Sequence, residues 1–245
     1  MQIFSTFSPN FNKKKRPFSK IKHIIIHYTG MHSERESLKR LTSFKSKVSS
    51  HYFICRKGKI HNLVDETKVA WHAGKSSWGN YKNLNNSSIG IELVNKGHDW
   101  GYQNFTKKQK LSLIKLCKKI IIKYRIKKND IVGHSDIAPD RKKDPGEKFP
   151  WSQLAKNNIG IWHSLKEREL KRFRRKKIKF KKDKIKFIKD LKKIGYNINL
   201  NSTNSHFKLV LKAFQRHYRN ELINDTLDQE CLIISENLRK MLKTA

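Results

Sequence analysis

This sequence is short of cysteine and of acidic residues, and it contains no long apolar run. Its three cysteines, Cys55, Cys117 and Cys231, are odd in number and far apart, which excludes a disulfide framework and a zinc site built from thiolates. The longest early apolar run is the isoleucine triplet at 24–26, whereas a membrane-spanning helix needs about 20 apolar residues. We therefore expect no transmembrane segment.

The first residues also lack the features of an export signal. They contain no apolar region of about 7–15 residues, and no early cysteine is available for a lipid. This absence predicts a cytoplasmic protein, or one exported by a route that the sequence does not display. Residues 1–20 are instead basic and contain proline, and we interpret them as an N-terminal arm.

Acidic residues are few in comparison with basic ones. Lys and Arg together number 56 against 20 Asp and Glu, which gives a net charge of +36. A polyanionic partner would explain this excess, whether it is nucleic acid, an anionic envelope polymer or a membrane surface. An AT-rich genome is the alternative explanation, because lysine far outnumbers arginine. No nucleic-acid-binding motif accompanies the charge, so we expect no nucleic-acid partner.

Strand and helix patterns alternate up to about residue 164, which predicts an α/β domain. Short β-branched runs predict strands at 22–27, 48–54, 59–64, 89–94 and 131–132. Capping boxes at 33–36 and 106–109 predict the starts of two helices. The composition then changes: residues 166–193 contain 16 Lys and Arg against 4 Asp and Glu. Apolar residues recur at helical spacing in three places: late in that run, at 206–218 and at 227–242. This spacing predicts a small all-helical unit.

One stretch, residues 131–151 (IVGHSDIAPDRKKDPGEKFPW), gathers side chains that bind metals. Its prolines and glycines exclude one continuous helix or strand. A catalytic zinc needs about three protein ligands and one open position. His134 and Asp144 of this stretch, with His27 at the end of the strand predicted at 22–27, could supply them. A packed, hydrogen-bonded core histidine is the alternative reading of His27.

Glu92 lies within the strand predicted at 89–94, on the face opposite Ile89 and Ile91. A carboxylate there is costly unless it is partnered, so it serves either a reaction or a structural ion pair. Beside a zinc ion it is the candidate general base. Lys142 could stabilise the oxyanion of a tetrahedral intermediate.

Five blocks of the sequence, taken in order, resemble one known family. The blocks are KHIIIHYTG, VSSHYFI, LVDETKVAWHAGKSSWGN, NNSSIGIEL and GHSDIAPDRKKDPGEKFPW. Together they resemble the zinc-dependent N-acetylmuramoyl-L-alanine amidases of the AmpD/AmiD type (amidase_2), which are related to the peptidoglycan recognition proteins. The resemblance covers about residues 20–164.

This resemblance implies a central mixed β-sheet flanked by helices and a groove that binds a muramyl-peptide. It implies one Zn²⁺ held by His27, His134 and Asp144, with Glu92 as the catalytic glutamate. Lys142 matches the family's oxyanion-stabilising residue, with its neighbour Lys143 as the alternative. The groove is expected to be lined by Tyr28, Trp71, His72 and Asn86. The implied reaction hydrolyses the amide between N-acetylmuramic acid, or its 1,6-anhydro form, and L-alanine in peptidoglycan or soluble muropeptides.

The prediction therefore has three parts: an arm (1–20), a zinc amidase catalytic domain (21–164) and a helical unit (165–245). The helical unit resembles the peptidoglycan-binding domain of AmiD-type enzymes, and its basic region could contact an anionic envelope polymer. The resemblance to AmiD-type enzymes also implies a periplasmic location as the alternative to a cytoplasmic one. A muropeptide-binding module without catalysis, and a basic nucleic-acid-binding protein, are the alternative functions.

Overall fold

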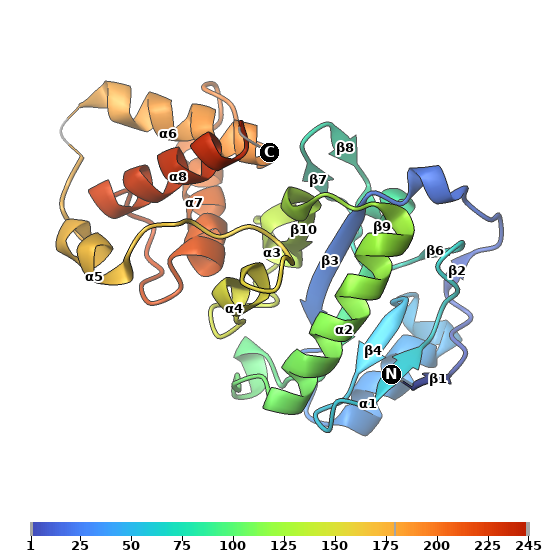
Figure 1. Cartoon of the computed structure of the whole chain (residues 1–245). Coiled ribbons are helices and arrows are strands. Elements are labelled where there is room, and N and C mark those ends of the chain that lie inside the picture. The colour runs from blue at the N-terminus through green and yellow to red at the C-terminus, as the bar shows by residue number, and fades with distance from the viewer. Residues whose placement is uncertain (1, 179, 244–245) are drawn as a thin grey trace.

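The computed structural model describes residues 2–178 and 180–243, and a mixed six-stranded sheet lies at its centre (Figure 1). Neighbouring strands run parallel except for the antiparallel pair β4–β5. In spatial order the strands are β1 (Ile3–Ser5), β5 (Ile60–Asn62), β4 (Tyr52–Ile54), β9 (Ser88–Leu93), β3 (His23–Tyr28) and β10 (Ile131–Gly133). The mixed sheet flanked by helices confirms the predicted fold class.

The central strands β3 and β9 send alternate side chains to opposite faces of the sheet. One face packs under the long helix α2 (Lys107–Tyr124), which crosses the sheet in Figure 1. This core contains Ile24, Ile26, Ile89, Ile91, Leu113, Leu116 and Cys117, all buried. The other face carries His27 and Glu92, which are register partners on β3 and β9. The apolar side chains of β3 and β9 on one face thus build the core, and His27 and Glu92 on the other face are available for a site.

Hydrogen bonds at the helix starts agree with the predicted capping boxes. At α1 (Glu34–Thr42) the Ser33 hydroxyl accepts the backbone N–H of Glu36 at 3.1 Å. At α2 both halves of the box are present, because Thr106 and Gln109 each accept the other's backbone N–H at 3.1 Å. These bonds satisfy donors that a helix leaves unpaired at its first turn.

The N-terminal residues differ from the predicted arm, because they are built into the sheets. Strand β1 pairs in parallel with β5, and β2 (Phe11–Asn12) pairs with β6 (Val69–Ala70). Arg16 is buried, and its guanidinium donates to the carbonyls of Glu66 and Ser88. Residue 20 is therefore not a boundary of the fold. A second small hairpin joins β7 (Ser77–Trp78) to β8 (Tyr81–Lys82).

The last part of the chain is all-helical, and it packs on the β10 side of the sheet next to α3 (His134–Ile137) and α4 (Trp151–Ala155) (Figure 1). Its helices are α5 (Glu167–Leu170), α6 (Lys181–Ile194), α7 (Asn204–Tyr218) and α8 (Gln229–Met241). Buried Ile25, Trp78 and Ile137 share one apolar cluster with Phe187 and Phe214 of these helices. Over the described residues, none of the helices has the length and apolar character needed to cross a membrane.

Candidate active site

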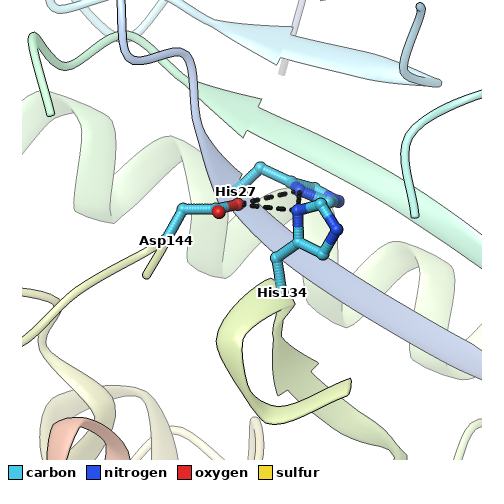
Figure 2. Close-up of side chains that lie close together, drawn as sticks. All are labelled: His27, His134 and Asp144. Atoms are coloured by element: carbon cyan, nitrogen blue, oxygen red, sulfur yellow. Dashed lines mark hydrogen bonds and ion pairs between the residues drawn. The ribbon is translucent and has the colours of Figure 1, made fainter. Parts of the chain in front are cut away.

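Three predicted metal ligands converge at the carboxyl ends of β3 and β10 (Figure 2). His27 comes from β3, His134 opens α3 directly after β10, and Asp144 lies in the following loop. The two Nδ1 atoms of His27 and His134 are 2.9 Å apart, and each lies 3.0 Å from Asp144 Oδ2. All three side chains are buried. The structure thus brings together residues that are up to 117 positions apart in the sequence.

The hydrogen bonds on the far side of each imidazole fix where its proton lies. His134 Nε2 lies 3.2 Å from the carbonyl oxygen of Ala73, which can only accept, so this nitrogen carries the proton. His27 Nε2 lies 3.0 Å from His72 Nδ1, and His72 Nε2 lies 3.2 Å from Ser88 Oγ, whose hydroxyl donates to Leu84 O. Ser88 Oγ therefore accepts a hydrogen bond from His72 Nε2, which leaves His72 Nδ1 as an acceptor. The proton of the bond between the two rings then lies on His27 Nε2. Each Nδ1 atom then carries no proton and has a free lone pair.

The electrostatics of His27 agree with that assignment. Burial, followed by the charge that His134 can carry, lowers the pKa of His27 to about 4, so its ring is neutral at neutral pH. Two lone pairs and a carboxylate oxygen facing one another at about 3 Å repel unless a cation lies between them. The donor set, two imidazole nitrogens and one carboxylate, suits zinc.

Glu92 lies beside this cluster, on the strand adjacent to His27. Its Oε2 atom is buried and has no hydrogen-bond partner among the described residues. Burial, and then the charge of Asp144, raise the pKa of Glu92 well above its ordinary value, while Lys142 and Arg40 oppose that shift. A structural ion pair would supply a direct partner, and none is present in the described part of the chain. The orphaned carboxylate therefore fits a reactive role better than a structural one.

A cavity of about 650 Å³ opens over these residues. His27, Glu92, His134, Lys142 and Asp144 all line it. The alternative Lys143 lines it as well, and the charge of Lys142 is among the main influences on the pKa of both His27 and Glu92. The predicted metal ligands and the two predicted catalytic residues thus share one chamber.

Of the four residues expected to line a groove, three line this cavity. Tyr28, Trp71 and His72 are among its walls, and His72 also bonds to His27. Asn86 lies elsewhere: it is exposed and is not among the cavity's lining residues. Its neighbour Asn85 is used instead, since Asn85 Oδ1 accepts the backbone N–H groups of His72 and Ala73. The structure therefore does not place Asn86 in this cavity, and two adjacent asparagines gave no local signal to tell which of them lies near the site.

Two supporting residues were not predicted from the sequence. Arg16 lies 3.0 Å from His51 Nε2, and the His51 Nδ1 atom accepts the N–H of Gly90, directly beneath the His72 ring. A Cβ on Gly90 would lie 2.5 Å from that ring, so only glycine fits there. Arg141 donates to the carbonyls of Ala73 and Lys75. Lysine and arginine are so frequent in this sequence that nothing marked Arg16 and Arg141 as supporting residues.

The sequence profile of the N-acetylmuramoyl-L-alanine amidase family (Amidase_2) matches residues 17–147, more than half of the chain. This chain belongs to that family. The N-acetylmuramoyl-L-alanine amidase AmiD of Escherichia coli (strain K12) is 37% identical over 233 residues, covering 90% of this chain and 83% of AmiD. A 1,6-anhydro-N-acetylmuramyl-L-alanine amidase, AmpD of Haemophilus influenzae, is 34% identical over 60% of this chain and 86% of AmpD.

Solved structures of the family agree with the fold. The E. coli AmiD complex with anhydro-N-acetylmuramic acid-L-Ala-D-γ-Glu-L-Lys has a TM-score of 0.78 at 36% identity and covers 94% of this chain and 92% of AmiD. AmpDh3 of Pseudomonas aeruginosa with anhydromuramic pentapeptide has a TM-score of 0.80 at 31% identity and covers 97% of this chain and 98% of AmpDh3. Both matches extend over most of the chain. The predicted membership of the AmpD/AmiD-type amidases is thereby confirmed.

Proposed function

We propose that this protein is a zinc-dependent amidase that acts on muropeptides. It hydrolyses the amide bond between N-acetylmuramic acid, or its 1,6-anhydro form, and the L-alanine of the stem peptide. Family membership supports the reaction class, and the relatives' names and substrate complexes support the substrate. The role is cell-wall turnover or recycling.

The observation that carries the proposal is the triangle formed by His27 Nδ1, His134 Nδ1 and Asp144 Oδ2. These atoms face one another as electron-pair donors in a buried site, and the family to which the chain belongs is zinc-dependent. When bound there, zinc acts as a Lewis acid that acidifies water and polarises a carbonyl. The Ala73 carbonyl and the His72 side chain hold the two imidazoles in the tautomer that a metal needs.

Glu92 and Lys142 take the two catalytic roles in this proposal. Burial makes the Glu92 carboxylate a stronger base than an exposed one, so it removes the proton of the attacking water and returns it to the leaving amine. The Lys142 ammonium, on the wall of the same cavity, stabilises the oxyanion of the tetrahedral intermediate. A module that only binds muropeptides needs neither an orphaned buried carboxylate nor a complete ligand set. Catalysis is therefore the better account.

The basic C-terminal region supplies a further contact in this proposal, with the intact wall or an anionic envelope polymer. Residues 166–193 contain 16 Lys and Arg against 4 Asp and Glu, and all the lysines of α6 are exposed or half-buried. Such attraction is electrostatic and weakens with salt. Sedimentation with insoluble peptidoglycan at low and high ionic strength tests it, and salt-independent binding would contradict it.

Metal analysis tests the zinc site. After dialysis the native protein should retain a single zinc ion per chain, and His134→Ala should lose it because a required ligand is gone. His206→Ala is the matched control, since His206 lies on α7 in the C-terminal unit and its side chain hydrogen-bonds only to the Asn197 carbonyl among the described residues. Full zinc content in His134→Ala would refute the ligand assignment.

A further inference from the structure

The buried carboxylate of Asp136 joins the C-terminal helices to the element that carries His134. Asp136 lies on α3, two positions after His134, and is 2% exposed. Its Oδ2 atom accepts the backbone N–H of Gly133 and pairs with His217 Nδ1, each at 2.7 Å. Its Oδ1 atom accepts the Tyr196 hydroxyl, also at 2.7 Å. Two of its three partners therefore come from the C-terminal unit.

Both partners are fixed by their own surroundings. His217 of α7 is 1% exposed, and its ring stacks on Trp151 of α4 with centroids 3.9 Å apart and planes at 16°. Tyr196 follows α6, is 2% exposed and lies edge-on to Trp78 at 4.9 Å. Burial and the Asp136 charge hold the pKa of Tyr196 well above its ordinary value, so its hydroxyl stays protonated and donates. The packing therefore holds the side chains of Tyr196 and His217 in place to bond Asp136.

A second contact reaches the loop that carries Asp144. Asn220, just beyond α7, donates from Nδ2 to the carbonyl of Glu147 at 2.9 Å. The same loop is held by the Tyr102 hydroxyl, which donates to the Pro145 carbonyl at 2.6 Å. The backbone N–H of Ser135 bonds to the Asp144 carbonyl at 2.8 Å, which ties the loop to α3. The C-terminal unit therefore touches both segments that present ligands after β10.

We propose that the C-terminal helical unit positions the metal site, with Tyr196 and His217 holding Asp136 and thereby α3 and His134. This inference rests on the proposed zinc function. The α3 helix has only four residues, too few to be stable alone, so its orientation depends on what holds it. Loss of a group that orients a metal ligand typically costs about 10–100-fold in metal affinity. Tyr196 and His217 are positioning residues in this account and do not touch the metal.

The alternative is that these contacts only join two units whose stability is shared. The two readings differ in one respect. A purely structural contact changes the free energy of unfolding without changing zinc affinity in the folded protein. A positioning contact changes zinc affinity beyond any loss of stability, and it alters the coordination geometry.

The test uses the full chain and Tyr196→Phe, which keeps the buried ring and removes only the hydroxyl. We expect the zinc dissociation constant, measured by competition with a chromophoric chelator, to rise about tenfold. The visible spectrum of the cobalt-substituted protein should also shift. Ile234→Val is the matched control: it removes one buried carbon from the core of the same unit and no hydrogen-bonding group. Its dissociation constant should stay within about twofold of the native value.

A native-like dissociation constant for Tyr196→Phe would overturn the inference, and so would an equal rise in Ile234→Val. If Tyr196→Phe fails to fold, Asn220→Ala decides, because Asn220 is only half-buried and its variant should fold. We expect a rise in its dissociation constant too, and a value within about twofold of native would overturn the proposal. A native protein that binds no zinc would instead refute the zinc function itself.

Discussion

Replacing Glu92 by Gln removes a proton acceptor while it preserves the shape of the side chain. Glu92 lines the cavity beside His27, and its Oε2 atom has no hydrogen-bond partner within the described ranges 2–178 and 180–243. Loss of a general base typically lowers a rate by about 10²–10⁴-fold, which corresponds to about 3–5 kcal/mol in the barrier. We expect kcat on a purified muropeptide to fall by that factor while zinc content stays native.

The same change should stabilise the protein. The pKa of Glu92 is raised by burial, so the folded state binds a proton more tightly than the unfolded state. Stability from this group is therefore present below the unfolded pKa, about 4.3, and is lost as the pH rises through the folded pKa. At pH 7.5 the native protein bears this loss and the glutamine variant does not. Metal-free Glu92→Gln should consequently melt at a higher temperature.

Glu66→Gln is a control of opposite sign. Burial disfavours the Glu66 carboxylate, but hydrogen bonds from Lys123, Tyr124 and Tyr52 outweigh it and lower the pKa. Stability from Glu66 is thus present at neutral pH, and the variant should melt lower yet remain active. Calorimetry of the metal-free proteins and kinetics of the zinc-loaded proteins check both variants. Lower stability with loss of zinc in Glu92→Gln would make Glu92 structural and refute the reasoning.

Three further predictions concern the surroundings of the site. Lys142→Ala should lower kcat by about 10²-fold or more with zinc content and KM little changed, as steady-state kinetics will measure, whereas a change in KM alone would assign Lys142 to binding. Gly90→Ala should destabilise by about 1–3 kcal/mol in chemical denaturation, because the added Cβ meets the His72 ring at 2.5 Å; unchanged stability would contradict that contact. Burial lowers the pKa of His23 to about 4 and of His51 to about 3, below the unfolded value of about 6.5. The unfolded state therefore binds protons at a higher pH than the folded state does. Lowering the pH from 7 to 5 should reduce the free energy of unfolding by about 2 kcal/mol for each of the two histidines, and a free energy of unfolding that does not change with pH would refute this.

The core and the central site follow from patterns that are local in sequence. Alternation in β9 placed Ile89 and Ile91 under α2 and Glu92 in the cavity, and the capping boxes located the starts of two helices. The ligand set His27, His134 and Asp144 came from residue chemistry at strand ends, supported by the family resemblance. Local patterns succeed here because burial on one face of a sheet depends on a period of two residues.

Long-range pairing was not visible in the sequence. Residues 3–5 form a sheet strand only because residues 60–62 lie beside them, and their basic surroundings suggested an arm. The bond between Asp136 and His217 joins residues 81 positions apart, so helical spacing in the tail predicted the helices but not their contact with α3. Arg16 was missed for a similar reason, since one buried arginine does not stand out in a lysine-rich segment.

The most direct test is mass spectrometry of a purified muropeptide after incubation with the zinc-loaded protein and with a chelator-treated control. The account predicts free stem peptide and peptide-free sugar with the zinc-loaded protein alone. An intact muropeptide after incubation with protein that demonstrably holds zinc would contradict the amidase and favour a binding module.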